Sequence, residues 1–572
     1  MLSDNVQADS EKLEQPGGFI SEIKFNTSKS LPVDKDSIVV FVGPNNAGKS
    51  QALKDIFTLC EKTIPTKVVS EIKITKSHQR ISTILENIST PNNQGRYTQY
   101  IVFEKIYPIF KNTDEEFERQ PTYGNMRDLF AAFLDTSARL KICEPPKNIT
   151  AESPKSHPIH FARFNTNCRE WLSSNFKKAF GKDLTPDSQF GETIPLRIGP
   201  RVRLEESFED EQLRQDAYSK ILSGYDQVQN QGDGIKSFTG ILLYLMLKHY
   251  RTFLIDEPES FLHPPQARIM GQIIGESLSS SQQCFISTHS EDIIKGLISI
   301  CPSRVKIVRI TRTDNNNTFS CLGSENLQDI WSDPLLRHSN IMSSLFHKTV
   351  VLCESDSDCK IYSIIDNHLK QKENTYSETL FIQCNGKHRM AKTISSLRSL
   401  SVNVKLITDA DVLDDVHIIQ NIAKSFDINW DEIKDYYKTI ESNLSNQDKK
   451  PKRSIARTEI NEILSKSNEE YISNSESAKI KKLLSSPSKW DSVKKHGASG
   501  IPQGNASYAY QKMNAILRDK GIFIVPVGEL ECFVRDIGGH GPEWVNQLLE
   551  HHPDLEDEHY KEIKEFIRSM KL

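Results

Sequence analysis

Residues 37–50 read SIVVFVGPNNAGKS, a short apolar run that passes directly into a glycine-rich loop. The apolar run predicts a buried parallel strand, and residues 49–62 predict the helix that follows the loop. The loop has the spacing G-x-x-x-x-G-K-S, in which successive backbone N–H groups surround a phosphate at a helix N-terminus. We expect Lys49 to reach the β- and γ-phosphates of ATP and Ser50 to hold Mg²⁺. The predicted nucleotide contacts are Gly43, Asn45, Asn46, Ala47, Gly48, Lys49 and Ser50.

Two further apolar runs end in polar side chains that suit ATP hydrolysis. Residues 252–256 end in Asp256 and are followed by Glu257, and residues 283–287 are followed by Thr288 and His289. Asp256 is a candidate magnesium ligand and nucleotide contact, and Glu257 is a candidate general base for the attacking water. His289 is a candidate sensor of the γ-phosphate. The alternative is that His289 only caps the helix that starts near Ser290.

Composition limits the class of protein. A chain of 572 residues is too long for one hydrophobic core, so two or three domains are expected. The net charge of -4 gives no general basic field, and any DNA contact must come from local patches. The ten cysteines are scattered without paired C-x-x-C spacing, which favours reduced core residues. Residues 1–18 lack an apolar signal region, and no run approaches the roughly 18 apolar residues of a membrane helix, so a cytoplasmic protein without a membrane partner is expected.

The second half of the chain has carboxylates after several predicted strands. The strands are expected at residues 348–354, 379–383, 403–408 and 522–527, and ligands collect at the carboxyl ends of parallel strands. Hard oxygen ligands suit Mg²⁺ or Mn²⁺, which can activate water for phosphodiester hydrolysis. The alternative is that these carboxylates are helix caps and solvent-exposed groups at strand ends. That alternative explains Asp358 well, but it does not readily explain carboxylates at three strand ends together. The candidate ligands are Glu354, Asp358, Asp409, Asp411, Glu529 and Glu531.

A lysine-rich stretch at about residues 425–505 separates Asp411 from the last predicted strand. Basic groups beside a metal site could hold phosphates, and a lysine could offset charge at the scissile phosphate. Lys494 and Lys495 are the candidates for that catalytic role. The alternative is that these lysines belong to solvated helix faces.

The sequences LIDEPE and STHS, at residues 254–259 and 287–290, resemble the ABC-type ATPase heads of the recombination and SMC-like class. The resemblance implies that Glu257 is the catalytic base and His289 the switch histidine. It also implies a signature segment, for which residues 231–237 are in the right place, with Gly234 and Ser237 as nucleotide contacts in the opposing subunit. A glycine turn that caps a helix is the alternative. Residues 114–182 are expected to form a helical, dimer-forming insertion, with a long solvated loop as the alternative.

The carboxylate half resembles the Toprim domain of topoisomerases, primases and related nucleases. The resemblance implies that Glu354, Asp409 and Asp411 hold a metal ion. Asp358 with Glu529 or Glu531 would then support a second one. Ser355 stands where that family usually has glycine, which puts the loop geometry in question. A topoisomerase would also need a tyrosine nucleophile, and no tyrosine here has a context that singles it out.

An ABC-type head followed by a Toprim domain resembles the OLD (overcoming lysogenization defect) family over about residues 20–550. The predicted fold is α/β, with an ATPase domain at residues 1–340 and a Toprim domain at residues 341–572. The family implies a homo-oligomeric (dimeric or tetrameric), ATP-binding and metal-dependent DNA endonuclease of anti-phage defence, whose cleavage is gated by the ATPase half in a direction that the sequence leaves open. Some relatives act with a helicase-like partner, as in Gabija systems, and others with a retron reverse transcriptase and its RNA–DNA product. The alternative is an ATP-driven DNA clamp or sensor whose Toprim half only binds.

Overall fold

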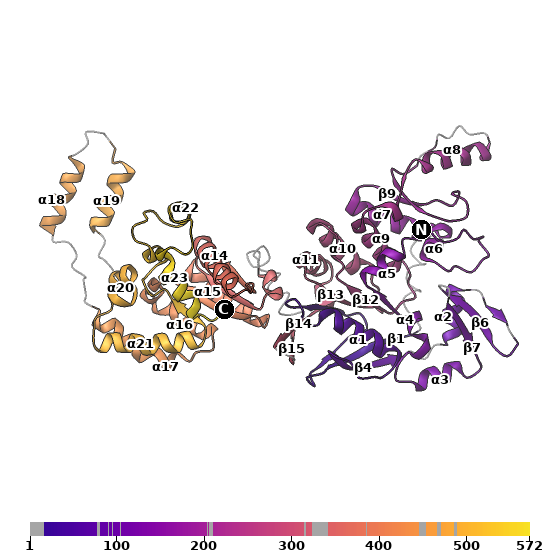
Figure 1. The fold of residues 1–572 in the computed structure, drawn as a ribbon, viewed down its shortest axis with the longest axis horizontal. Coiled ribbons are helices and arrows are strands. Elements are labelled where there is room, and N and C mark those ends of the chain that lie inside the picture. The colour runs from indigo at the N-terminus through magenta and orange to yellow at the C-terminus, as the bar shows by residue number, and fades with distance from the viewer. Residues whose placement is uncertain are drawn as a thin grey trace, which may run out of the picture. The chain divides into compact units, whose positions relative to one another are not determined.

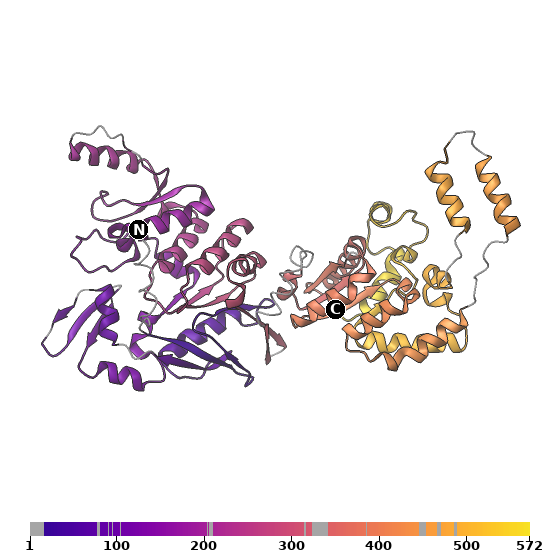
Figure 2. The ribbon, with the colours of Figure 1, turned by 180° about the vertical axis from the view of Figure 1, so that it is seen from behind.

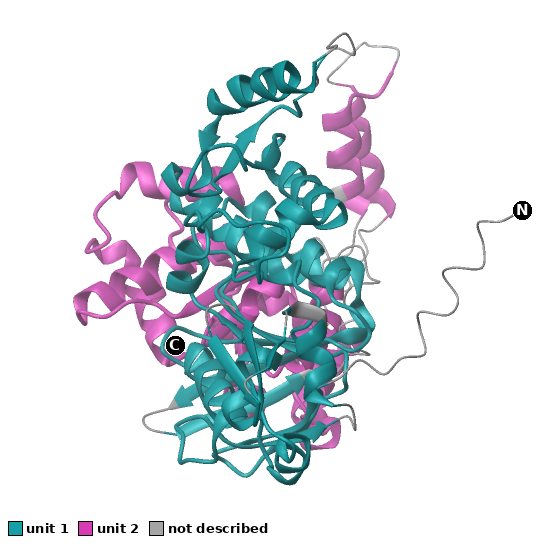
Figure 3. Ribbon diagram, turned by 90° about the vertical axis from the view of Figure 1, so that its right-hand side faces the viewer, with its two compact units in different colours: residues 1–337 teal, residues 338–572 magenta. Residues whose placement is uncertain are grey.

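The computed structural model describes residues 17–76, 80–89, 91–93, 95–102, 105–202, 204, 210–313, 316–322, 341–384, 386–444, 453–465, 471–484 and 489–572. The chain divides into two compact units, residues 1–337 and 338–572, which are coloured separately in Figure 3. Among the described helices, none is both long and apolar enough to cross a membrane. Three of the lysines in the predicted basic stretch, Lys449, Lys450 and Lys452, lie outside the described residues.

Unit 1 is built on a six-stranded sheet with the order β15-β14-β3-β13-β12-β8. The strands from β14 to β8 are parallel, and only the edge strand β15 is antiparallel to its neighbour. The β-branched run of β3 is fully buried, as a central strand covered on both faces requires. The strand bounds are β3 Ile38–Val42, β8 Ala131–Leu134, β12 Thr252–Asp256, β13 Gln283–Ser287, β14 Val305–Thr313 and β15 Asn316–Leu322.

Helices and a small antiparallel sheet cover the two faces of this sheet. On one face α1 and the sheet β2-β1-β4 share a core with β3, while α10 packs on α11 along the other side (Figure 1). The helices of the unit are α1 Lys49–Glu61, α2 Ile81–Ile88, α3 Thr113–Arg119, α4 Arg127–Phe130, α5 Thr136–Lys141, α6 Pro158–Phe164, α7 Thr166–Phe180, α8 Glu211–Ser223, α9 Asp233–Leu245, α10 Pro264–Ser277 and α11 Glu291–Ile300. The smaller sheets contain β1 Gly18–Phe25, β2 Ser30–Pro32 and β4 Val69–Lys76, then β5 Asn92–Asn93, β6 Thr98–Val102 and β7 Lys105–Ile109, and finally β9 Asp183–Pro186, β10 Leu196–Gly199 and β11 Asp226–Gln227.

The predicted helical insertion at residues 114–182 is only partly helical. Helix α7 lies within this stretch and agrees with the prediction, but β8 interrupts the first half of the stretch. Residues 131–134 (AAFL) instead form an edge strand of the main sheet, paired in parallel with β12. A short apolar run fits a buried strand and a buried helix equally well, so periodicity alone could not separate them.

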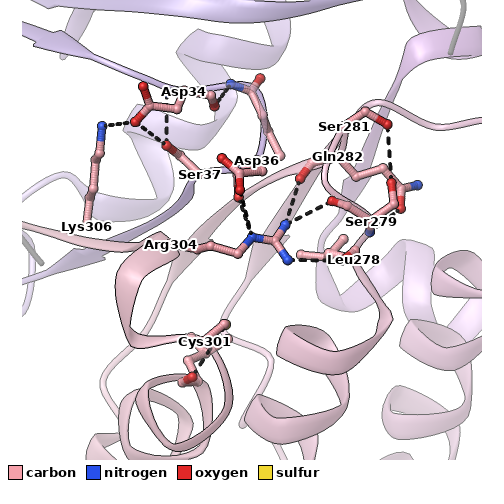
Figure 4. A network of polar contacts seen from close by, with 12 residues as sticks. Asp34, Asp36, Ser37, Leu278, Ser279, Ser281, Gln282, Cys301, Arg304 and Lys306 are labelled. Atoms are coloured by element: carbon pink, nitrogen blue, oxygen red, sulfur yellow. Dashed lines mark hydrogen bonds and ion pairs between the residues drawn. The ribbon is translucent and has the colours of Figure 1, made fainter. Parts of the chain in front are cut away.

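The amino ends of the central strands are tied together through Arg304. Its guanidinium donates to the carbonyl oxygens of Asp36 at 2.8 Å, Leu278 at 3.0 Å, Ser279 at 3.0 Å and Gln282 at 3.3 Å (Figure 4). These carbonyls belong to the segments that lead into β3 and β13. One partly buried cation therefore satisfies several carbonyls at the edge opposite the glycine-rich loop.

Unit 2 contains a four-stranded parallel sheet with the order β17-β16-β18-β19. The last strand ends at Ile524, earlier than predicted, because Pro526 lacks the N–H that would continue the ladder. The strands are β16 Thr349–Cys353, β17 Thr379–Gln383, β18 Asn403–Thr408 and β19 Ile522–Ile524. The helices are α14 Asp356–Lys372, α15 Met390–Ser399, α16 Val416–Ser425, α17 Trp430–Asn443, α18 Arg453–Leu464, α19 Asn474–Leu484, α20 Asp491–His496, α21 Asn505–Asp519, α22 Pro542–His551 and α23 Lys561–Ser569 (Figure 2 shows them from behind).

Replacement of Arg304 tests the importance of this network. We expect Arg304→Ala to lower the free energy of unfolding by about 2–4 kcal/mol, because hydrogen bonds from a charged donor are lost and their carbonyls stay buried. Lys306→Ala is the matched control, since it removes a partly exposed ion pair with Asp34 and should cost about 1 kcal/mol or less. Urea unfolding of the full chain measures both. Equal losses in the two variants would contradict the role given to Arg304.

Candidate functional site

The glycine-rich loop connects β3 to α1 and needs its glycines. Gly43 has a φ of 139°, and a Cβ at this position would collide with the carbonyl oxygen of Ile310. Gly48, the N-cap of α1, has a φ of 102°, and Asn46 also has a positive φ, of 61°. Left-handed backbone of this kind lets successive N–H groups point into one concavity. The loop therefore has the conformation that phosphate binding requires.

Lys49 lies where the loop meets the end of β12. Its Nζ donates to the carbonyl oxygens of Gly43 at 2.9 Å and Pro44 at 2.8 Å, and the residue is 5% exposed. Burial lowers the pKa of the ammonium to about 8, while the carboxylates of Glu257, Glu259 and Asp256 act in the opposite direction. The predicted phosphate-binding lysine and the predicted hydrolytic carboxylates thus share one electrostatic environment.

The ends of β12 and β13 place Asp256, Glu257 and His289 side by side. Asp256 accepts a hydrogen bond from the Ser287 hydroxyl, and Glu257 Oε1 lies 3.8 Å from His289 Nε2. Burial and the charge of Lys49 lower the pKa of His289. Glu257 has a φ of 48°, a strained conformation that is common at functional sites. The three residues predicted from the strand ends are therefore brought together.

Glu259 is a residue of this site that the sequence analysis missed. Its Oε1 accepts a hydrogen bond of 2.7 Å from the backbone N–H of His289. Burial raises the pKa of the Glu259 carboxyl. Glu259 thus fixes the backbone that carries His289. The second glutamate of the LIDEPE segment was the available signal.

Arg139, on α5, is a second missed residue and joins the predicted signature segment to the end of β12. Its guanidinium donates to the Ser237 hydroxyl at 3.0 Å, the Glu257 carbonyl at 3.2 Å and the Asp256 carbonyl. Both Arg139 and Ser237 are 0% exposed. The hydroxyl of Ser237 therefore faces the interior of its own unit, and its contact with a nucleotide stays a prediction. A lone arginine outside any motif gave no signal in the sequence.

Gly234 occupies the first turn of α9, as expected for a signature glycine. A Cβ at Gly234 would collide with the carbonyl oxygen of Phe261. Phe261 itself has a φ of 67° and is 58% exposed. The start of α9 and the segment after Glu259 are therefore packed closely, and both reach the surface of the unit.

In unit 2 the predicted carboxylates meet at the carboxyl edge of the sheet. Glu354 follows β16, and Asp409 and Asp411 follow β18. Burial raises the pKa of Asp409 well above its usual range, and Asp358, Glu354 and Asp411 raise it further. Within the described residues, Glu354 Oε2 and Asp411 Oδ1 are buried and have no hydrogen-bond partner. Buried oxygens without partners beside like charges fit a site for a hard divalent cation.

Two lysines partly offset these charges. Lys387 Nζ donates to Asp411 Oδ2 at 3.0 Å, and Lys494 Nζ lies 4.0 Å from both Asp411 Oδ2 and Glu529 Oε2. Lys494 was predicted, whereas Lys387 was not assigned a role. Lys387 follows β17 at the same edge of the sheet, and that position was the signal that could have identified it.

Close backbone contacts bring Lys494 to the site. A Cβ at Gly528 would collide with the Lys494 carbonyl oxygen, and one at Gly497 would collide with the Pro526 carbonyl oxygen. The side chain of Lys495 is exposed, and its carbonyl oxygen accepts a hydrogen bond of 3.2 Å from Arg535. Of the two candidate lysines, Lys494 is therefore the one whose ammonium lies beside the carboxylates in the described part of the chain.

The candidate ligands for a second metal ion differ in their hydrogen-bond partners. Asp358 closes a capping box at the start of α14, with Oδ2 accepting hydrogen bonds from Ser355 N at 2.9 Å and Oγ at 3.1 Å. Glu531 accepts a hydrogen bond from Gly541 N at 2.8 Å and lies 3.3 Å from His540 Nδ1. Glu529, Glu531 and His540 have ligand atoms within 4.8 Å of one another. His540 was not predicted, since it lies outside any motif.

Comparisons with known proteins agree with this division of the chain. Residues 38–294 match the family model "AAA domain, putative AbiEii toxin, Type IV TA system", and residues 345–411 match "Overcoming lysogenization defect protein-like, TOPRIM domain". The Old nuclease of Escherichia phage P2 is 20% identical over 173 residues, which is 29% of this chain and 29% of that protein. The match therefore spans less than a third of that relative. These matches confirm the predicted resemblance, an ATPase domain followed by an OLD-like Toprim domain in an α/β chain.

Two solved structures are also similar to part of the chain. An SMC head bound to the C-winged helix domain of ScpA has a TM-score of 0.33 and 13% identity, over 54% of this chain and 99% of that one. The SMC head domain from Thermotoga maritima has a TM-score of 0.28 and 12% identity, over 54% of this chain and 98% of that one.

Removal of one buried charge tests the electrostatics of the carboxylate edge. In metal-free protein at pH 7 we expect Asp409→Asn to raise the melting temperature by about 2–6 °C, because the pKa of Asp409 is raised and its ionised form opposes folding. A raised carboxyl pKa means that the folded state binds more protons than the unfolded state. The stability of the wild type should therefore increase as the pH falls from 8 towards 5, and less so in the variant.

The control for this experiment is Asp356→Asn, in the first turn of α14. The Asp356 side chain is 57% exposed and pairs with Lys360, so its loss should lower stability slightly. Thermal unfolding with a chelator present gives both values. If Asp409→Asn lowered the melting temperature as much as Asp356→Asn does, the result would contradict the unfavourable burial and repulsion of the Asp409 charge.

Proposed function

We propose that this chain is an ATP-regulated, divalent-metal-dependent DNA endonuclease of the OLD type that acts in anti-phage defence. The observation that carries the proposal is the cluster of Glu354, Asp409 and Asp411 at the carboxyl edge of the sheet, in which Glu354 Oε2 and Asp411 Oδ1 are buried without a hydrogen-bond partner and the pKa of Asp409 is raised. Such a cluster is costly to the fold and is expected at a functional site. A site that only bound DNA would hardly place more carboxylates than lysines against phosphates, so the geometry favours catalysis over a binding platform.

The residues of unit 2 divide the work of phosphodiester cleavage. Glu354, Asp409 and Asp411 would hold Mg²⁺ or Mn²⁺, and the bound ion would supply an activated water and stabilise the leaving oxygen. Lys387 fixes the position of the Asp411 carboxylate through the hydrogen bond of 3.0 Å. Lys494, between Asp411 and Glu529, would neutralise the scissile phosphate. Glu529, Glu531 and His540 offer the ligands for a second ion.

Unit 1 would bind ATP between two copies of the chain. Lys49 and the loop would hold the phosphates, Ser50 and Asp256 the magnesium ion, and Glu257 would orient the attacking water. Gly234 reaches the surface at the start of α9, where it could meet the nucleotide of a second copy. A homo-oligomer formed through the ATPase half follows from this arrangement. A retron reverse transcriptase with its RNA–DNA product, or a helicase-like protein, is the proposed class of additional partner.

The nuclease proposal predicts the behaviour of Glu354→Gln. We expect cleavage of supercoiled and linear DNA in Mg²⁺ or Mn²⁺ to fall at least about 100-fold, because a metal ligand is lost. The matched control is Glu373→Gln, a partly exposed glutamate at the end of α14, which should cleave at the wild-type rate. Metal-dependent cleavage by Glu354→Gln at the wild-type rate would refute the assignment of the active site.

The regulatory proposal predicts different effects for two changes in unit 1. Lys49→Ala should abolish ATP binding, whereas Glu257→Gln should bind ATP but hydrolyse it about 10²–10⁴-fold more slowly, because only the general base is lost. We expect the second variant to accumulate as an ATP-bound oligomer in light scattering. Its rate of DNA cleavage then gives the sign of the ATP effect. Identical cleavage by both variants and the wild type, with and without ATP, would remove ATP from the proposal.

A further inference from the structure

A second cluster of metal-ligating side chains lies outside the carboxylate edge, in the C-terminal part of unit 2. Asp536 follows the short helix at Leu530–Phe533, His552 directly follows α22, and His559 lies just before α23. One ligand atom from each of these residues lies within 4.8 Å of those from the other two. Neither the proposed cleavage nor ATP hydrolysis uses any of them.

The carboxylate of Asp557 fixes both imidazole rings. Asp557 Oδ2 lies 2.9 Å from His552 Nδ1, and Oδ1 lies 2.6 Å from His559 Nδ1. The ring centroids are 3.8 Å apart, with an interplanar angle of 33°. A carboxylate that accepts the Nδ1 proton of histidine selects the tautomer whose Nε2 can bind a metal ion. Here a single aspartate does this for two rings.

The spacing of the remaining atoms suits a small tetrahedral ion. His559 Nε2 and Asp536 Oδ2 are 3.2 Å apart. Two ligands at the usual zinc distances, near 2.1 Å, are separated by about 3.4 Å in a tetrahedral site. Hence this pair can bind one ion with little movement.

We propose that Asp536, His552 and His559 form a structural zinc site, with Asp557 as the carboxylate that orients both histidines. Two imidazoles and one carboxylate favour Zn²⁺ over Mg²⁺, which prefers oxygen ligands alone. Water is the fourth ligand. On binding, Zn²⁺ takes the Nε2 lone pair of each ring, and the proton that His559 shares with Asp536 leaves to solvent.

The site would connect segments that support the carboxylate edge. Asp536 is five residues beyond Glu531, and Trp544 of α22 donates to the carbonyl oxygen of Val534 at 3.4 Å. Tyr560 donates to the His552 carbonyl oxygen at 2.8 Å, beside the start of α23. A zinc ion at this position would fasten the loop that follows Glu531 to the last two helices of the chain.

Zinc binding by the full-length protein tests the proposal. We expect the chelator-treated wild type to bind one equivalent of Zn²⁺ tightly in excess Mg²⁺, which occupies the carboxylate edge. The variants His552→Gln and His559→Gln should lose this equivalent, and Asp557→Asn should weaken it about 10–100-fold. The matched control His551→Gln changes the neighbouring histidine, whose Nδ1 contacts the Gln547 carbonyl oxygen, and should retain the zinc.

Two results of these binding measurements would overturn the proposal. One is a wild type that binds no tight zinc in excess Mg²⁺. The other is loss of the equivalent in His540→Gln with retention in His552→Gln, which would move the zinc to the group formed by Glu529, Glu531 and His540. Zinc K-edge absorption of the wild type needs no variant, and a first shell with two imidazoles is the expected result. A shell without imidazole would equally exclude the site.

Discussion

Parallel pairing of strands is the constraint on which both candidate sites depend. In a parallel sheet every strand ends at the same edge, so strand pairing alone brings together side chains that follow different strands. In unit 1 this brings the loop after β3 to the ends of β12 and β13. In unit 2 it brings Glu354, Asp409 and Glu529 together, although they lie far apart in the sequence. The functional residues are therefore fixed by backbone hydrogen bonds before any side-chain contact is made.

Parallel pairing also brings charged side chains close together in partly buried positions, which is electrostatically unfavourable. The two units offset this unfavourable energy in different ways. Unit 1 sets one buried lysine, Lys49, against the carboxylates near β12, and the pKa of the ammonium falls to about 8 because burial outweighs their attraction. Unit 2 gathers more carboxylates than its lysines neutralise, and burial with mutual repulsion raises the pKa of Glu354 and Asp409. Cation binding would relieve that repulsion, so the proposed activity and the stability of the fold are linked through the same residues.

The sequence predicted the parts of the structure that follow a recognisable local pattern. One such pattern is a strand, a glycine-rich loop and a helix, and the other is a strand followed directly by a carboxylate. Those patterns place Lys49, Asp256, Glu354 and Asp411 correctly because chain order and parallel pairing together determine their positions. Local patterns do not predict Arg139, because its hydrogen bonds to Ser237 and Asp256 form only when α5, α9 and the end of β12 pack together. Ser237 shows the converse limit, because its spacing fits a signature segment while its side chain is buried, which spacing alone cannot reveal.

The segment between β18 and β19 supplies Lys494, a residue of the candidate site that no strand of the Toprim sheet carries. Ala410 N donates to the Gly528 carbonyl oxygen at 2.7 Å, and Ala498 N donates to the Pro526 carbonyl oxygen at 3.0 Å. These bonds hold the end of the inserted segment against the strand ends and direct Lys494 to the carboxylates. Helices α18 and α19, in the middle of the insertion, pack on each other instead. The insertion thus combines an end that is held against the carboxylate edge with a pair of helices that pack on each other.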